Sequence, residues 1–273
     1  MSSILYVIKI GGNIIDDEEK LFSFLKQFSL IKEKKILIHG GGKLATNIAE
    51  QLQIPQQIIE GRRVTDTATL KVIAMVYAGF INKNITALLQ SNNCNALGLT
   101  GADGNLLQAH KRTSKALSVG EDLGEVIDYG FVGDIDTVNI RLLNNLLEAS
   151  ITPVIAPITH DTKGQLLNTN ADTIAQEISK SLAGSYAVTL IYCFEKNGVL
   201  ENYEDESSVI AEINAASYKD LKEKQIIHSG MIPKLDNAFA ALNNGVEKVI
   251  IGKAEELSQL ISGTSGTRIA NEQ

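Results

Sequence analysis

The chain has 273 residues, of which 44% are hydrophobic and 21% are charged. This composition excludes a disordered chain, and the length is compatible with one large domain or with two lobes. The formal net charge of −7 argues against nucleic acid as a partner, because no surplus of Lys and Arg is available to displace counterions from phosphates. The 22 glycines greatly outnumber the 4 prolines, which indicates turns that need backbone freedom rather than a proline-rich linker.

Neither the N-terminus nor the cysteines indicate export. The apolar run at the N-terminus is short and is interrupted by Lys9, unlike the core of a signal peptide. No stretch approaches the roughly 20 apolar residues of a membrane span. Cys94 and Cys193 have no metal-site or disulfide spacing, and we expect both to be small buried hydrophobic residues. We therefore predict a cytoplasmic, soluble protein without a membrane partner.

Strands and helices are predicted to alternate along the whole chain. Apolar β-rich runs mark the strands, and apolar residues spaced three or four apart mark the helices. In chain order the predicted elements are a strand at 4–10, a helix after 17, a strand at 35–38, a helix at 43–52, a long helix at 66–90, a strand at 95–99, a hairpin at 118–134, a helix after 136, a strand at 152–158, a helix at 171–182, a strand at 187–194, helices at 214–224 and 231–243, a strand at 246–251 and a short helix from 255.

This alternation is typical of an α/β fold with a parallel sheet and helices on its faces. A new strand–helix series begins near residue 180, where we place a lobe boundary. Asp66 and Asp136 are predicted to cap the helices that follow them. The apolar stripe of the long helix is predicted to comprise Leu70, Ile73, Tyr77, Ile81 and Leu88.

Two glycine loops follow the first two predicted strands. Gly11-Gly12 and Gly40-Gly41-Gly42 each lie between a strand and a helix. Backbone N–H groups of such loops face an anion without hindrance from a Cβ atom, and the helix N-terminus adds a positive dipole end. The pair of loops indicates a phosphate site, whereas either loop alone is equally well a tight turn.

The second loop also resembles motifs of two other functions. Residues 40–45 fit the dinucleotide pattern G-x-G-x-x-A, which would suggest an NAD-dependent oxidoreductase. The match is isolated and follows the second strand rather than the first. His39 with the three glycines also resembles an esterase oxyanion loop, but the chain contains no G-x-S-x-G nucleophile motif.

Several charged residues lie where a buried strand or a turn does not need them. Lys9 interrupts an apolar strand, so it either lies on an edge strand or serves a function. Arg62 and Arg63 either form a solvated loop pair or clamp a carboxylate. Lys234 lies in the first turn of a predicted helix, where a cation opposes the helix dipole and needs another reason to be there, such as a phosphate.

Residues 168–172, Asn-Thr-Asn-Ala-Asp, open another predicted helix. Asn170 or Asp172 could serve there only as a helix cap. Considered without the other motifs, capping is the better explanation for both.

Five motifs together resemble those of the amino acid kinase family. In order, they are Ile8-Lys9-Ile10-Gly11-Gly12, His39-Gly40-Gly41-Gly42, Gly61-Arg62-Arg63-Val64-Thr65, Asn168-Thr169-Asn170-Ala171-Asp172 and Gly230-Met231-Ile232-Pro233-Lys234. Their order and spacing are most similar to those of members that phosphorylate N-acetylglutamate. The resemblance spans the chain from Lys9 to Arg268.

This resemblance implies a three-layer αβα sandwich around a mainly parallel central sheet. Residues 1–180 would form the lobe that binds the acylglutamate, and residues 181–273 the lobe that binds ATP. The γ-phosphoryl group of ATP would move to the side-chain carboxylate of N-acetyl-L-glutamate, giving N-acetylglutamyl 5-phosphate for arginine biosynthesis. Mg²⁺ would arrive on the nucleotide, held by phosphate oxygens and water, so no residue is assigned as a metal ligand.

The resemblance also implies a role for each candidate residue. Lys9 and Lys234 would stabilise charge on the transferring group, and Asp172 would hold both ammonium groups without acting as a base. The remaining assignments are Gly11 and Gly12 for the phosphoryl group, Gly41 and Gly42 for the substrate, Arg63 for its α-carboxylate, and Asn168 for the acylated amine side.

Two features depart from the family pattern. Family members usually carry Thr or Ser followed by Asp after the strand near the nucleotide, where this chain has Cys193-Phe194. Arginine-inhibited hexameric members carry an additional N-terminal helix, whereas only three residues precede the first predicted strand here. We therefore expect an arginine-insensitive homodimer.

Other functions stay open at this level. N-succinylglutamate could replace N-acetylglutamate as the acceptor, since the sequence does not reveal the pocket beyond residues 61–65. Another kinase of the family is a further alternative. Because Cys193-Phe194 departs from the pattern, a non-catalytic ligand sensor is considered too.

Overall fold

The structure is a computed structural model that describes residues 3–59, 62–113, 115–116, 126–227 and 231–271. Its centre is an eight-stranded sheet in the order β14-β16-β15-β13-β1-β2-β10-β5, in which only β15 and β16 pair antiparallel. The strands are β1 (Ile4–Ile10), β2 (Lys34–His39), β5 (Ala96–Leu99), β10 (Thr152–Ile155), β13 (Ala187–Phe194), β14 (Glu212–Ile213), β15 (Lys248–Lys253) and β16 (Thr267–Ile269).

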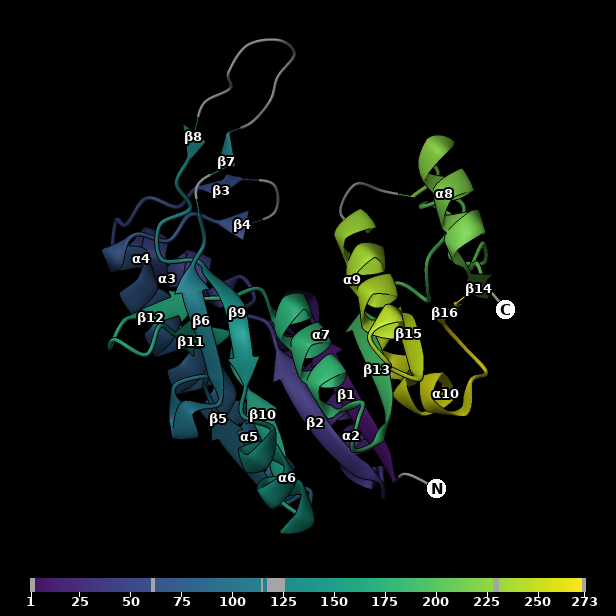
Figure 1. Ribbon diagram of the computed structural model, residues 1–273, viewed down its shortest axis with the longest axis horizontal. Helices are drawn as coiled ribbons and strands as arrows, with labels where there is room; N and C mark the ends of the chain where they lie inside the picture. The colour runs from purple at the N-terminus through teal and green to yellow at the C-terminus, as the bar shows by residue number, and fades with distance from the viewer. Residues whose placement is uncertain (1–2, 60–61, 114, 117–125, 228–230, 272–273) are drawn as a thin grey trace.

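Helices cover both faces of this sheet, as the two hydrophobic cores show (Figure 1). One face carries α2 (Glu18–Leu30), α3 (Leu44–Gln51), α4 (Thr67–Ile73), the π-helix η1 (Ala74–Ile81), α5 (Asn82–Ser91) and α10 (Leu257–Ser262). The other carries α6 (Ile140–Glu148), α7 (Ala171–Leu182), α8 (Ala215–Glu223) and α9 (Ile232–Asn243). Successive residues of β1 point to opposite cores, Leu5 and Val7 to one, Ile8 and Ile10 to the other. The predicted αβα sandwich is confirmed.

Short elements extend the structure around the C-terminal ends of the central strands. A second sheet has the order β12-β11-β6-β9, and two small hairpins pair β3 with β4 and β7 with β8. These elements are β3 (Ile58–Ile59), β4 (Arg62–Arg63), β6 (Leu107–Lys111), β7 (Lys115–Ala116), β8 (Val126–Ile127), β9 (Gly133–Val138), β11 (Ile158–His160), β12 (Leu166–Asn168), α1 (Gly12–Ile15), and the 3₁₀ turns η2 (Asp103–Asn105) and η3 (Ala254–Glu256). The middle of the predicted hairpin, residues 117–125, lies outside the described residues.

The cap predicted at Asp136 is wrong. Asp136 lies within strand β9, and the N-cap of the helix is Asn139, three residues later. The Asn139 side chain accepts a hydrogen bond from Leu142 N at 3.0 Å. Both residue types cap helices well, so local sequence did not decide between them.

The long helix is present, and Asp66 caps it by accepting a hydrogen bond from Thr69 N at 2.7 Å. Its middle third, η1, is π-helical, which advances the buried face by one residue. Ile81 is therefore followed in the core by Ile85 and Leu89, and the predicted Leu88 is only half-buried. A regular 3.6-residue period did not anticipate this shift.

The same helix also corrects an expectation about membrane spans. Thr67–Ser91 is long and apolar enough to cross a membrane by length and composition alone, with a mean hydropathy of 1.5 in its most apolar window. In the structure 44% of that window is buried, and the core helices of soluble proteins meet the same criterion.

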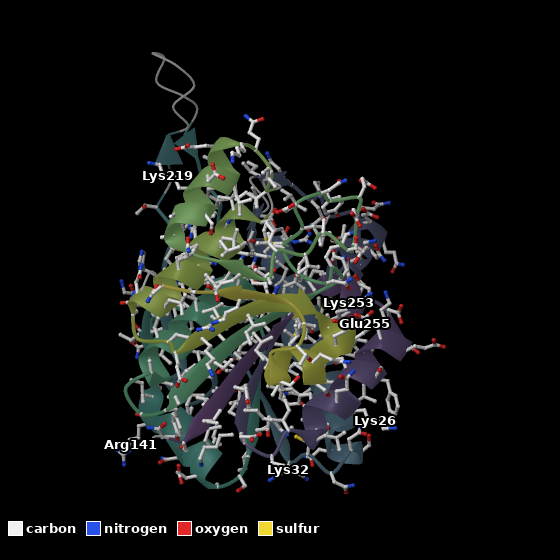
Figure 2. The ribbon with its side chains drawn as sticks, turned by 90° about the vertical axis from the view of Figure 1, so that its right-hand side faces the viewer. Lys26, Lys32, Arg141, Lys219, Lys253 and Glu255 are labelled. Atoms are coloured by element: carbon white, nitrogen blue, oxygen red, sulfur yellow. The ribbon has the colours of Figure 1, made fainter. Side chains whose placement is uncertain are left out.

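Charged side chains such as Lys26, Lys32, Arg141 and Lys219 project from the surface (Figure 2).

Candidate active site

Lys9, Asp172 and Lys234 come together from three elements that are distant in sequence. Lys9 Nζ lies 2.7 Å from Asp172 Oδ1, and Lys234 Nζ donates a hydrogen bond to Asp172 Oδ2 at 3.0 Å. Lys9 belongs to β1, which lies between β2 and β13, so the edge-strand explanation for this lysine is wrong. The carboxylate thus links the two ammonium groups, and the three residues together form the junction cluster.

The charge of Asp172 is fixed by its two partners. Burial would raise the pKa of this carboxyl, but the ammonium groups of Lys9 and Lys234 outweigh burial and hold the pKa well below its ordinary value. Asp172 is therefore ionised at neutral pH. A carboxylate held in this way positions cations and is a poor proton acceptor.

The start of α7 explains how Asp172 is free to face the lysines. Asn170 is the N-cap, and its side chain accepts hydrogen bonds from the backbone N–H groups of Asp172 and Thr173 at 2.7 and 3.3 Å. Because Asn170 satisfies these donors, the Asp172 carboxylate is not needed as a cap. The capping explanation holds for Asn170 and fails for Asp172.

Two cavities meet at the junction cluster. The first, of about 380 Å³, contains Lys9 and Lys234 in its wall, and the second, of about 260 Å³, contains Lys9 and Asp172. The first is lined further by Gly11, Gly12, Asn13, Ile14, Phe194, Glu195, Lys196, Gly198, Val199, Leu200, Tyr203, Ile226, Ile227 and Met231. The second is lined further by Gly40, Gly41, Ile58, Arg63, Tyr77, Arg112, Val132, Gly133, Pro157, Asn168, Thr169, Asn170, Ala171 and Thr173.

The two glycine loops pack directly against each other beside the cluster. A Cβ atom on Gly12 would lie 2.7 Å from Gly42 Cα, and one on Gly41 would lie 1.9 Å from the Tyr77 ring. Gly42 has φ +59°, in the left-handed region that favours glycine. Gly12, Gly41 and Gly42 are thus required for packing, whatever their backbone N–H groups bind, whereas Gly11 and Gly40 leave room for a Cβ atom.

His39 and Asn82 hold the second glycine loop in place through hydrogen bonds. Neither residue was predicted from the sequence as part of the site. His39 is fully buried, and burial lowers its pKa to about 4. Its Nδ1 lies 2.8 Å from Gly40 O, a pure acceptor, so Nδ1 carries the proton and Nε2 accepts from Asn82 Nδ2 at 3.1 Å. Asn82 also donates to Val154 O at 3.0 Å. A neutral histidine thus ties the loop to the sheet and to the long helix.

Arg63 points into the second cavity from β4. Its Nη2 donates to Thr46 Oγ1 at 2.9 Å, and its Nη1 donates to Gln56 Oε1. Both partners are neutral, and within the described chain no carboxylate lies within ion-pair distance of Arg63. The guanidinium is therefore oriented but not neutralised, which suits it to a carboxylate ligand.

Asn168 also lies at the second cavity, at the end of β12. Its Nδ2 donates to Thr65 Oγ1 at 3.1 Å. With Gly41 and Arg63, it completes the part of the predicted site that borders this cavity. Gly61 and Gly230, two members of the family-like motifs, lie outside the described residues.

Cys193 and Phe194 behave differently, although they are neighbours. Cys193 is buried, and burial raises the pKa of its thiol to about 12, so it packs as a small apolar residue. Phe194 lines the first cavity together with Tyr203, Leu200 and Met231. Phe194 therefore adds an aromatic ring to the apolar part of this wall.

Asp16 and Arg112 are further site residues that sequence reasoning missed. Both carboxylate oxygens of Asp16 accept from Lys43 N at 2.9 Å, which ties α1 to the start of α3. Arg112 lies at the second cavity and pairs with Asp134. Asp16 looked like a helix-start residue, and Arg112 lay beside a hairpin without a recognisable motif.

Known proteins resemble this chain over nearly its full length. Residues 5–253 match the amino acid kinase family. The Acetylglutamate kinase of Cytophaga hutchinsonii is 55% identical over 97% of this chain and 98% of its own length, and that of Parabacteroides distasonis is 50% identical over the same shares. The crystal structure of smu.665 from Streptococcus mutans UA159 superposes with a TM-score of 0.75 at 26% identity, covering 97% of this chain and 98% of that one.

Proposed function

This chain belongs to the amino acid kinase family, and we propose that its two cavities hold the two substrates of a phosphoryl transfer between them. The enzyme phosphorylates the side-chain carboxylate of N-acetyl-L-glutamate with ATP, a step of arginine biosynthesis. The first cavity is the nucleotide cavity and the second is the acylglutamate cavity. The observation that carries this assignment is the junction cluster, which belongs to the walls of both.

The reaction needs charge neutralisation more than proton transfer. The bond between the γ-phosphorus of ATP and its β–γ bridging oxygen breaks, its electron pair leaves with ADP, and a bond forms from the carboxylate oxygen to phosphorus. The acceptor is already ionised at neutral pH, so no general base is required. Lys9 and Lys234 stabilise the charge on the transferring group, and Asp172 fixes the positions of both ammonium groups.

The acylglutamate is bound by groups of the second cavity. Arg63 binds its α-carboxylate, Asn168 the acylated amine side, and Gly41 offers its backbone N–H group. Gly42, which was predicted to bind the substrate as well, follows Gly41 in the loop but does not line this cavity. Gly11 and Gly12 serve the phosphoryl group at the start of α1, beside Lys9. This arrangement leaves the γ-carboxylate to be placed near Lys9, where the two cavities meet.

The nucleotide cavity fits ATP. The apolar side chains of its wall, Phe194, Tyr203 and Met231, suit the faces of a planar base, and Lys9 and Lys234 in the same wall suit the phosphates. Mg²⁺ bound to the phosphate oxygens would neutralise part of their charge. In the ranges that the structure covers, no group of three His, Cys, Asp or Glu side chains could hold a metal.

The residues that line the two cavities support the binding of one substrate by each lobe. The nucleotide cavity draws most of its wall from residues 194–234, and the acylglutamate cavity draws its whole wall from residues 9–173. We therefore assign residues 1–180 to the acylglutamate lobe and 181–273 to the ATP lobe. The central sheet runs through both, because β1 pairs with β13.

A homodimer in the cytoplasm is also part of the proposal. Met75 and Phe80 on the long helix are 59% and 63% exposed, and Leu97 on the edge strand β5 is 41% exposed. A second copy of the chain that covers these apolar side chains would remove them from water. The two free cysteines agree with a reducing compartment. Light scattering on the wild type and on Phe80→Glu tests the dimer, which the charge should weaken.

Trapping with hydroxylamine tests the reaction itself. The purified enzyme is incubated with ATP, Mg²⁺, N-acetyl-L-glutamate and hydroxylamine, which converts an acyl phosphate to a coloured hydroxamate. Product should appear only when all of these are present, and it should fall strongly in Lys9→Ala. Absence of hydroxamate while ATP binding persists would favour the non-catalytic sensor instead.

A further inference from the structure

The two glycine loops line different cavities, so their relative position sets how the two substrates meet. Gly11 and Gly12 line the nucleotide cavity, and Gly40 and Gly41 line the acylglutamate cavity. Phosphoryl transfer depends mainly on positioning, and a displacement of about 1 Å can cost roughly 100-fold in rate. A contact that holds one loop against the other should therefore matter for the reaction, even where it touches no substrate.

The carboxylate of Asp16 makes such a contact. Asp16 ends α1, and its backbone N–H donates to Gly12 O at 2.9 Å. Its two carboxylate oxygens accept from Lys43 N, each at 2.9 Å. Lys43 directly follows the second loop and is the N-cap of α3, but its own side chain makes no capping bond. Asp16 thus satisfies a backbone donor at the start of α3 from across the gap between the loops.

Gly42 leaves the space that this carboxylate occupies. A Cβ atom on Gly42 would collide with Asp16 Oδ1, and the φ of +59° at Gly42 also favours glycine. Neither cavity wall includes Gly42. The absence of a side chain at this position therefore serves the contact with Asp16 rather than the binding of substrate.

We propose that Asp16 is a positioning residue for the phosphoryl transfer, because it fixes the loop beside the phosphoryl group against the loop of the acylglutamate cavity. Neither cavity wall includes Asp16, so it acts through the two loops and is not a catalytic residue. The inference rests on the proposed function, since it concerns the placement of the same two substrates.

A purely structural role for Asp16 makes a different prediction. Asp16 is exposed, so water can replace its bonds to Lys43 N when the carboxylate is removed, and the free energy of unfolding should change little. A water molecule does not fix the distance between the two loops, however. We therefore expect the rate of transfer to fall by more than the stability of the fold.

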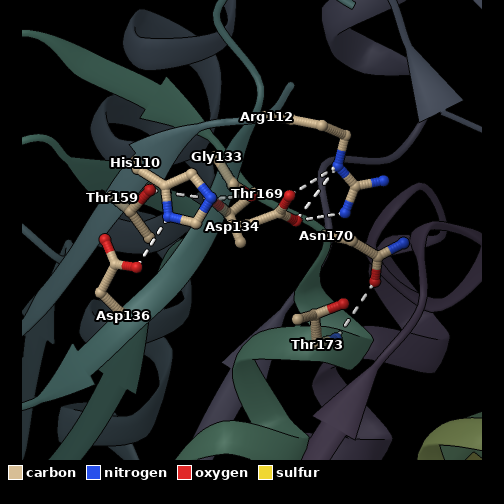
Figure 3. A network of polar contacts seen from close by, with 9 residues as sticks. All are labelled: His110, Arg112, Gly133, Asp134, Asp136, Thr159, Thr169, Asn170 and Thr173. Carbon is tan, nitrogen blue, oxygen red and sulfur yellow. Dashed lines mark hydrogen bonds and ion pairs between the residues drawn. The ribbon is translucent and has the colours of Figure 1, made fainter. Parts of the chain in front are cut away.

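Other parts of the acylglutamate cavity are held by contacts that do not involve Asp16. Arg112 pairs with Asp134, and the Asn170 side chain accepts from Thr173 N at 3.3 Å, as Figure 3 shows. These contacts remain when Asp16 is replaced. Substrate binding should therefore persist, and the loss should appear in kcat rather than in KM.

The test compares Asp16 with its neighbour Asp17 in the full chain. Asp17 also accepts from a backbone N–H, that of Lys20 at 3.0 Å, but this bond caps α2. In the hydroxylamine assay with N-acetyl-L-glutamate, Asp16→Ala should lower kcat by about 10- to 100-fold and change KM for either substrate by less than about threefold. Asp17→Ala is the matched control. It should lower the urea midpoint of unfolding and leave kcat near the wild-type value.

Asp16→Asn shows whether the hydrogen bond to Lys43 N is the reason. The amide oxygen of asparagine still accepts from this N–H, so kcat should return close to the wild-type value. An Asp16→Asn enzyme as slow as Asp16→Ala would overturn the inference. An unchanged kcat in Asp16→Ala would overturn it as well, and so would a loss of activity that only follows the loss of folded protein in urea. A wild type that forms no hydroxamate overturns the proposed function, and this inference with it.

Discussion

The nucleotide cavity and the acylglutamate cavity share Lys9 but are otherwise built from different side chains. The nucleotide cavity combines an apolar part, which includes Phe194 and Met231, with charged side chains such as Glu195 and Lys196, whereas the acylglutamate cavity presents mainly guanidinium, amide and hydroxyl groups. An apolar wall depends on shape and tolerates replacement by residues of similar volume. Directed hydrogen bonds to charges do not tolerate such replacement. We therefore expect the acylglutamate cavity to tolerate substitutions less well than the apolar part of the nucleotide cavity.

The largest effect is expected where the two cavities meet. Lys234→Ala should lower kcat by about 10²–10³-fold, because it removes one preorganised donor to the transferring group. KM for both substrates should change less than kcat. Steady-state kinetics with hydroxylamine trapping measure this, and Lys219→Ala, which removes an exposed cation from α8, is the control. A kcat close to that of the wild type would contradict the role of Lys234 in stabilising the transferring group.

The acylglutamate cavity should also depend on pH for its stability, because neutral His39 supports its glycine loop. The pKa of His39 is lowered to about 4, so the folded state resists a proton that the unfolded state takes up near pH 6.5. The contribution to stability is complete above pH 6.5 and is lost as the pH falls toward 4. The difference of about 2.5 pH units corresponds to roughly 3 kcal/mol of unfolding free energy.

Urea unfolding at several pH values between 7.5 and 4.5 measures this loss. His39→Gln should unfold with a flatter pH dependence than the wild type across this window, since glutamine does not titrate. The other histidines are present in both proteins, so their contributions cancel in the comparison. Parallel pH profiles would mean that folding does not lower the pKa of His39.

A conservative change at the polar cavity should be costly. Arg63→Lys keeps the charge but loses the fork that Thr46 and Gln56 hold, so KM for the acylglutamate should rise by about 10-fold or more. KM for ATP should stay near its wild-type value. If the change appeared in KM for ATP alone, the assignment of the two cavities would be reversed.

A conservative change at the apolar cavity should have the smallest effect. Phe194→Leu keeps an apolar side chain in the wall, so KM for ATP should change by less than about 10-fold. The KM for the acylglutamate serves as the internal control. A larger effect than that of Arg63→Lys would contradict the contrast between the two cavities.

Much of the fold followed from local patterns. The predicted bounds of β1, α7 and β13 agree with the structure, because each is a continuous or strictly periodic apolar segment with a clear boundary. The short strands of the second sheet were mostly missed. Strands of three to six residues, such as β9 and β12, depend on partners elsewhere in the chain and carry little periodicity of their own.

Most residues of the candidate site could be predicted from the sequence, but their arrangement in space could not. The motifs named Lys9, Asp172 and Lys234, and the structure brings these three into contact. No local signal marked Asn82 or Arg112, because each acts through a residue that is distant in sequence or through a cavity formed by several elements. Contacts of this kind exist only after the chain has folded.

The sequence by itself therefore determined the alternation of strands and helices, the family, and the residue types of the site. Tertiary structure alone decided that β1 lies between β2 and β13, which brings Lys9 to Asp172 and Lys234 at the border of two cavities. It also decided that Arg112 and Arg63 line the same cavity. The physical reason is that propensity and periodicity act over a few residues, whereas burial and charge pairing depend on which distant segments pack together.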